Sequence, residues 1–163
     1  MAVRETGPNE TAGQADAVMR ATRVLVGIIA RSITEVEQEV SITQFRVLVM
    51  VATRGSLNLG EVAEGLGVHP SNATRTVERL VVAGLVERAE NPADRRYLVL
   101  KLTPQGQDIV ERVMAYRRGA IESVLEEMPA GRRQALAAAL GAFAEAAGEP
   151  SRGEEAYVLG LPT

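Results

Sequence analysis

Hydrophobic positions follow a helical period through the first half of the chain. From Asp16 to Glu39 apolar side chains recur at steps of three and four, the pattern of one long amphipathic helix. Shorter apolar stripes follow between Ser41 and Gly55, at 60–66 and at 70–83. Residues that commonly begin or end helices bound these stripes: capping oxygens at Ser41 and Thr43, Gly67, and His69 before Pro70. The sequence therefore predicts four helices before Gly84.

After Gly84 the period changes from helical to alternating. Leu98, Leu100 and Leu102 share one face of a short segment, and a polar stretch at 91–94 separates it from an earlier apolar pair at 85–86. This arrangement is typical of a β-hairpin with a polar tip.

Two further helices are expected after the hairpin. Thr103 and Pro104 supply a cap and a first helical residue for a long helix that Pro129 interrupts. A last helix at 131–147 carries apolar residues at packing intervals, namely Ala135, Leu136, Ala139, Leu140, Phe143 and Ala147. Residues 1–12 are interpreted as a flexible arm, and residues 149–163 as a tail that is either disordered or docked on another surface.

Composition narrows the chemistry that the chain can perform. Its 163 residues include no cysteine and one histidine, His69, with a formal net charge of −3. This excludes disulfides, thiol catalysis and a metal site that needs two histidines, so no cofactor or metal is expected. No apolar stretch reaches the roughly 18 residues of a membrane helix, and no signal-peptide core is present. These features predict a cytoplasmic protein without a membrane partner.

Charge is distributed unevenly along the chain. Residues 41–103 hold eight basic and six acidic side chains, a net charge of +2, which leaves −5 for the remainder. A polyanion would therefore approach the centre of the chain.

The order helix, turn, helix with a polar face, and hairpin is the winged helix-turn-helix pattern. A helix fits the major groove of duplex DNA, and residues near its N-terminus approach the base edges; here these are Ser71, Asn72, Thr74 and Arg75. We assign the DNA backbone to Thr76, Arg79 and Arg95. An arginine at the hairpin tip reaches the narrow minor groove, where the negative potential favours a guanidinium, so we assign Arg96 there with Asp94 orienting it.

Several alternatives compete with this interpretation. The polar side of residues 70–83 is also compatible with a solvated face of a structural helix, and Asp94 with Arg96 is compatible with an exposed ion pair worth about 0–1 kcal/mol. His69 is better explained as a helix cap than as a ligand. The sequence contains none of the usual glycine-rich phosphate loops or nucleophile elbows, so an enzyme is not expected. A winged-helix adaptor without sequence-specific DNA binding remains the alternative function.

The central residues resemble MarR-type (multiple antibiotic resistance regulator) transcription factors. The resemblance rests on Leu66–Leu80, on Gly84–Arg88 and on the wing signature Asp-x-Arg-(x5)-Leu-Thr, which falls at Asp94, Arg96, Leu102 and Thr103. With the flanking helices, the resemblance covers approximately residues 14–147. The chain departs from the pattern at Pro70, at Thr76 and in the tail of 15 residues.

The resemblance implies a homodimer that binds a pseudo-palindromic operator in double-stranded DNA, most simply as a repressor. Residues 13–40 and 104–148 would form the helical dimerisation region, and residues 41–103 the winged helix-turn-helix. The acidic, amphipathic terminal helices fit dimerisation independently, since a helix with an apolar stripe needs a partner surface.

The family also implies a response to a small lipophilic or phenolic effector, bound where the dimerisation helices meet the DNA-reading region. From helix phase and family analogy, the expected pocket walls are Ile28, Arg31, Phe45, Val49 and Val113. For Phe45, as for Tyr116 and Phe143, a place in the core is favoured over a place in an effector pocket. A regulator without any effector is the alternative.

Overall fold

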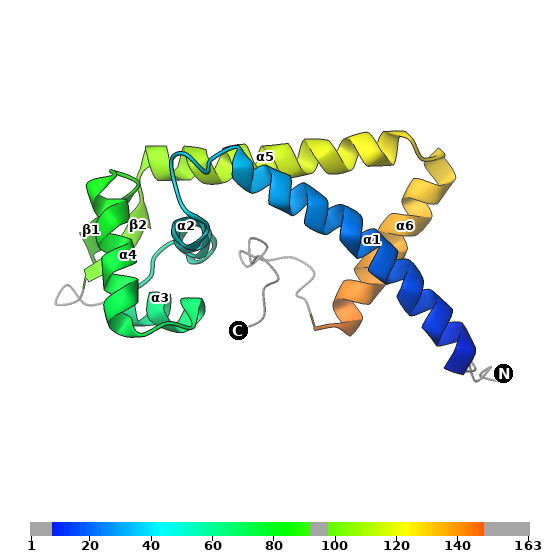
Figure 1. The fold of residues 1–163 in the computed structure, drawn as a ribbon, viewed down its shortest axis with the longest axis horizontal. Coiled ribbons are helices and arrows are strands. Elements are labelled where there is room, and N and C mark those ends of the chain that lie inside the picture. Colours follow the sequence, from blue (N-terminus) through cyan, green and yellow to red (C-terminus); the bar gives the residue numbers. More distant parts are fainter. Residues whose placement is uncertain (1–7, 92–97, 149–163) are drawn as a thin grey trace.

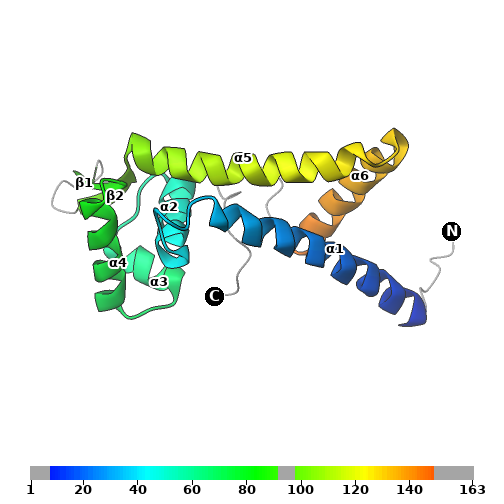
Figure 2. The same ribbon diagram turned by 45° about the horizontal axis from the view of Figure 1, so that its top comes forward.

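The computed structural model describes residues 8–91 and 98–148 and has six helices and one hairpin in them. Helices α2 (Ile42–Arg54), α3 (Leu59–Leu66) and α4 (Pro70–Val82) gather with strands β1 (Val86–Glu90) and β2 (Leu98–Leu102) at one end of the molecule (Figure 1). Helices α1 (Pro8–Thr34), α5 (Pro104–Glu126) and α6 (Ala130–Ala146) project away from this module. Figure 2 shows the same separation from a second direction. The mainly α class with a small hairpin is confirmed.

The core lies within the module and reaches the first half of α5. Phe45 and Leu48 of α2, Val62 of α3 and Val77 and Leu80 of α4 are fully buried in one continuous apolar cluster. Helix α5 joins this cluster through Ile109, Val110 and Val113. The module and the first half of α5 therefore share one core.

The hairpin is a two-stranded antiparallel sheet with Val86 opposite Leu102 and Glu90 opposite Leu98. Leu57, in the turn between α2 and α3, adds an isolated bridge to Leu100, with backbone hydrogen bonds of 3.2 and 2.7 Å. The side chains of Leu57 and Leu100 are buried. The bridge ties the hairpin to the helices of the module.

The first helix differs from its prediction at both ends. It begins at Pro8, so residues 8–12 of the expected arm are helical, and residues 1–7 lie outside the described part. Proline is favoured in a first helical turn, and Ala12, Gln14 and Ala15 are good helix formers. Helix α1 ends at Thr34 instead of Glu39, and 35–39 form turns.

These turns explain why the helical period misled the prediction. The Val36 N–H donates to the Ile33 carbonyl and the Glu39 N–H to the Val36 carbonyl, at 3.1 and 2.9 Å. Consecutive bonds over three residues keep a near-helical spacing after the helix has ended. Val36 and Val40 therefore still point into the core.

Helix α6 lies close to its predicted bounds, but most of its apolar surface is uncovered in the protomer. None of its residues is buried, and Leu140 and Phe143 are 53% and 58% exposed.

Among the described residues, no helix is long and apolar enough to cross a membrane.

Candidate nucleic-acid interface

Helix α4 is fixed in the module by its apolar side. Ala73, Val77 and Leu80 are fully buried, and α4 packs chiefly against α3, with further contacts to α2 and β1. The tight turn between α3 and α4 depends on Gly67, whose φ of 66° lies in the left-handed region that favours glycine. The Gly67 and Val68 amides both bond back to the last turn of α3.

The DNA contacts predicted on α4, to base edges and to the backbone, lie mainly on the side opposite its buried face. Ser71, Asn72, Arg75 and Arg79 are exposed, as a surface that meets DNA requires. The helical phase places these four residues on one face, away from the buried side. None of these four side chains is drawn into the core of the module.

Thr74 and Thr76 are less accessible for DNA contacts than the sequence predicts. Both are half-buried, and their hydroxyls donate to the carbonyls of Pro70 and Asn72 at 3.0 Å. A threonine that bonds back one helical turn keeps acceptor capacity, but its hydroxyl proton is already engaged.

The predicted wing residues Asp94, Arg95 and Arg96 lie outside the described residues. The base of the wing is described, and it places the opposite charges of Glu87 and Lys101 directly across from each other in the strand register.

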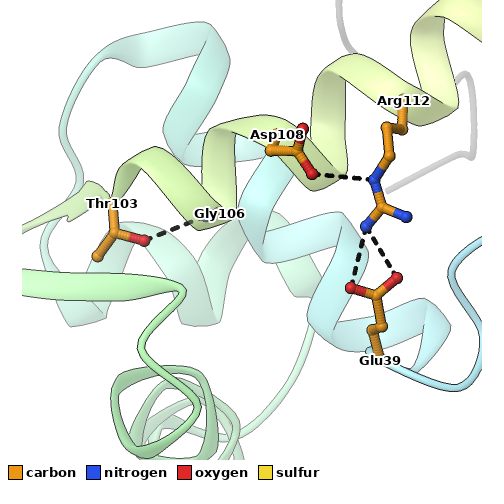
Figure 3. A network of polar contacts seen from close by, with 5 residues as sticks. All are labelled: Glu39, Thr103, Gly106, Asp108 and Arg112. Atoms are coloured by element: carbon orange, nitrogen blue, oxygen red, sulfur yellow. Dashed lines mark hydrogen bonds and ion pairs between the residues drawn. The ribbon is translucent and has the colours of Figure 1, made fainter.

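A compact set of bonds joins the hairpin to α5. The Thr103 N–H donates to the Leu85 carbonyl at 3.1 Å, and the Thr103 hydroxyl donates to the Gly84 carbonyl at 2.7 Å. The same hydroxyl oxygen accepts from the Gly106 N–H at 3.1 Å, which caps α5 (Figure 3). The end of α4, the hairpin and α5 are therefore held together around Thr103.

A second polar contact joins α5 to the turn before α2. Arg112 donates through Nη2 to both carboxylate oxygens of Glu39, at 2.8 and 2.9 Å, and through Nε to Asp108 at 3.0 Å (Figure 3). The hydrogen bond to Glu39 is the main reason why the pKa of Arg112 is raised above its ordinary value. Both ends of this contact are exposed to solvent.

The expected effector-pocket walls differ from one another in burial. Phe45, Val49 and Val113 are buried in the core of the module, whereas Arg31 is exposed. Helix phase alone identified buried positions but did not identify where the packing leaves space.

An apolar groove of about 320 Å³ lies instead between α1, α5 and α6, and it shares Ile28 with the expected walls. We call it the terminal-helix groove. Its lining is apolar except for one arginine and comprises Ala21, Val24, Leu25, Ile28, Ile121, Val124, Leu125, Met128, Arg133, Leu136, Ala137 and Leu140.

Sequence reasoning missed Arg117, a half-buried cation where α1, α2 and α5 meet. Its Nε donates to Ser32 Oγ at 2.8 Å, and its guanidinium carbon lies 6.0 Å from the centre of the Phe45 ring. Its Nη2 is buried and finds no hydrogen-bond partner among the described residues. Burial lowers the pKa of Arg117 from its ordinary value.

A signal for Arg117 exists in the sequence. It lies four residues after Val113 and four before Ile121, so a charged residue occupies the phase of the apolar stripe of α5.

A helix-turn-helix followed by a hairpin that packs on it defines a winged helix-turn-helix protein. Comparison with known proteins agrees. Residues 40–98 match the sequence model of the MarR family. The structure is similar to that of RV1404 from Mycobacterium tuberculosis, with a TM-score of 0.75 and 41% identity, covering 91% of this chain and 100% of that one. It is also similar to YusO from Bacillus subtilis, with a TM-score of 0.66 and 26% identity over 86% and 99% of the two chains.

Among named relatives, the chain is 36% identical to the transcriptional repressor MdtR of Bacillus subtilis over 89 residues, which cover 55% of this chain and 57% of that protein. It is equally identical to the multiple antibiotic resistance protein MarR of Salmonella typhimurium over 74 residues, or 45% and 51% of the two chains. The chain thus spans about half the length of these relatives. It belongs to the MarR family, and the named relatives are regulators, not enzymes.

Proposed function

We propose that this protein is a transcriptional repressor that binds a pseudo-palindromic operator as a homodimer. The observation that carries the proposal is the exposed polar face of α4, on which Ser71, Asn72 and Arg75 lie opposite a fully buried side. Arg79 lies one turn further along this face and is suited to a phosphate. The repressor MdtR is a relative in this same part of the chain, which supports the assignment. As a DNA-binding protein it would act in the cytoplasm.

In this proposal the wing completes the interface. The paired strands would carry Arg96 to the minor groove, with Asp94 orienting it and Arg95 on the backbone. Arg96→Ala should weaken operator binding while the dimer stays intact. Unchanged affinity, measured by electrophoretic titration beside a size-exclusion control, would remove the minor-groove role.

The homodimer is supported by the surface of the terminal helices. Val24 and Leu25 of α1, Val124 of α5 and Leu140 and Phe143 of α6 are between 43% and 58% exposed. Several of these side chains line the terminal-helix groove. A contiguous apolar surface of this kind usually marks an interface, so we assign residues 13–40 and 104–148 to dimerisation and residues 41–103 to DNA binding.

The test of this function is selection of bound fragments from random duplex DNA, followed by titration against salt. An inverted repeat with half-sites about 34–36 Å apart would support both the class and the dimer. Several phosphate contacts predict a steep fall of affinity with salt. A monomer that binds no duplex at low ionic strength would favour a winged-helix adaptor that contacts protein instead.

We further propose a small lipophilic or phenolic anion as effector, bound where α1, α2 and α5 meet. The unpaired Nη2 of Arg117 beside Phe45 supports an anion at this junction, since a buried guanidinium is stabilised by a charged acceptor. An anion that binds better to a DNA-incompetent arrangement would release the operator.

Salicylate is a suitable probe, because it is a phenolic carboxylate. It should lower operator affinity of the wild-type protein but not of Arg117→Met. Equal responses of the two proteins would place the effector elsewhere, and no response of either would contradict this effector class.

A further inference from the structure

The only histidine of the chain caps the helix that carries the proposed reading residues. His69 has extended backbone angles, φ −62° and ψ 141°, which suit both an N-cap and a residue before proline. Its Nδ1 lies 3.3 Å from the Ser71 amide nitrogen and 2.9 Å from Ser71 Oγ. The imidazole is exposed, so it is accessible to protons from solvent.

His69 satisfies each of the first amides of α4. Pro70 has no N–H, and the amides of Asn72 and Ala73 donate to the His69 carbonyl at 2.9 and 3.3 Å. The Ser71 amide donates to the imidazole instead. The cap therefore depends on an imidazole nitrogen, where Ser, Thr, Asp or Asn would supply an oxygen.

The proton position on the imidazole follows from this contact. To accept from the Ser71 amide, Nδ1 must carry its lone pair, so the hydrogen of the neutral ring is on Nε2. When the ring is protonated, Nδ1 also carries a hydrogen and can donate to Ser71 Oγ, but it can no longer accept from the amide. Protonation also places a positive charge at the positive end of the helix dipole.

We infer that His69 is a positioning residue for the DNA-reading surface, and that its protonation lowers discrimination between operator and other duplexes. The first turn of α4 carries Ser71 and Asn72, which the proposed function places against base edges. Loss of the cap makes this turn less ordered. Fixing the two side chains on the operator then costs more conformational entropy. The inference rests on the proposed function.

Charged residues lie on α4 and on each element that packs against it. In the described residues, Ser71 is the side chain that His69 bonds. Helix α4 packs against α3, α2 and β1. The charged residues of these elements are Glu61, Glu64, Arg46, Arg54, Glu87, Arg88 and Glu90, and α4 itself adds Arg75, Glu78 and Arg79. Glu61 accepts from the Asn58 amide at the far end of α3, and Arg46 donates to the Gly65 carbonyl.

Protonation has a second effect that the experiment must remove. An added positive charge near the interface strengthens binding to any duplex through the phosphates, whatever the base sequence. The ratio of operator affinity to random-duplex affinity cancels this contribution. A cap that orders base-reading side chains raises operator affinity more than random-duplex affinity. The ratio of these two affinities is therefore the quantity to measure.

The experiment compares this ratio at pH 5.8 and pH 8.0, at constant ionic strength, for the wild-type protein, His69→Asn and His69→Ala. The pH values span most of the range over which histidine changes charge (about 5 to 8). Asparagine is a strong cap that does not titrate, whereas alanine removes the cap. We expect the wild-type ratio to fall about twofold to tenfold at the lower pH, the size of a typical capping effect. The ratio should stay high for His69→Asn and low for His69→Ala at both pH values.

Two results would overturn the inference: a wild-type ratio that changes no more with pH than that of His69→Asn, or a His69→Ala ratio equal to that of the wild type at pH 8.0. Failure to select any operator would refute the proposed function instead. The cap itself is tested without DNA by nuclear magnetic resonance. The Ser71 amide shift should titrate together with the ring protons of His69, and an amide shift that does not follow them would show that the cap is absent.

Discussion

Gly106 is the position where one added carbon should do most damage to the joint between the hairpin and α5. It is the third residue of α5 and is buried against the segment that connects α4 to β1. A Cβ built on Gly106 would lie far inside van der Waals contact with the Leu85 carbonyl oxygen, 3.0 Å from the Leu85 carbonyl carbon and 3.4 Å from Leu102 Cδ2. The two nearest atoms are backbone, so no rotamer change can relieve the overlap.

The loss of stability expected for Gly106→Ala can be estimated from the contacts that must shift. The Leu85 carbonyl accepts from the Thr103 amide, and Thr103 in turn bonds Gly84 and Gly106. Separating α5 from Leu85 strains these bonds together. Overpacking costs about 1–3 kcal/mol and each weakened hydrogen bond about 1 kcal/mol, so we expect a loss of about 2–4 kcal/mol in the free energy of unfolding. For a chain of this length that corresponds to a fall in Tm of about 4–16 °C.

The assay is urea and thermal unfolding followed by circular dichroism, at one fixed protomer concentration because association would stabilise the fold. Gly119→Ala is the matched control, since Gly119 lies in the same helix with nothing within 4 Å of an added Cβ. Alanine there should leave stability equal or raise it by about 0.5–1 kcal/mol. If Gly106→Ala proves as stable as Gly119→Ala, the close approach of α5 to Leu85 is refuted.

Three further outcomes are expected. Arg75→Ala should reduce discrimination between operator and random duplex by about 1–3 kcal/mol, whereas Arg79→Ala should weaken all duplexes alike; a uniform loss for Arg75→Ala in competition titrations would make it a phosphate contact. Arg117→Met should leave the free energy of unfolding unchanged or raise it, because it removes a half-buried cation with an unpaired nitrogen; a loss above about 2 kcal/mol in urea titration would show that the cation is needed. Glu39→Gln should cost at most about 1 kcal/mol, and less in high salt, since its contact with Arg112 is exposed; a larger, salt-independent cost would contradict this.

The local features of the fold could be predicted because they depend on neighbouring residues. Ser41 and Asn58 both form capping boxes, His69 and Thr103 cap α4 and α5, and Gly67 adopts the left-handed conformation. All of these features except the Asn58 cap are predicted from the sequence. Such capping signals depend only on the chemistry of three or four consecutive residues. They can therefore be identified without knowledge of the tertiary structure.

Features that depend on what packs against a helix could not be predicted in the same way. An apolar stripe shows that a face needs cover, but it does not show which surface covers it. Thus the helical phase of Val49 and Val113 does not show that they lie in a continuous core, and it does not predict the terminal-helix groove. Ser32 and Arg117 occupy apolar phases of two different helices, and only the fold brings them together.

Buried residues are concentrated in the module and in the first half of α5. The buried residues of α5 end at Val113, and the second half of this helix, like the whole of α6, has none among the described residues. Most helical stability in proteins comes from packing of an apolar face, yet the 17 residues of α6 keep Leu140 and Phe143 on the surface. The core of the module is completed by the first half of α5, whereas the apolar side chains of α6 and of the second half of α5 are largely uncovered in one protomer. Association of two copies would therefore stabilise the same helices that set the distance between two α4 faces, so dimer stability and operator spacing would be governed by one set of contacts.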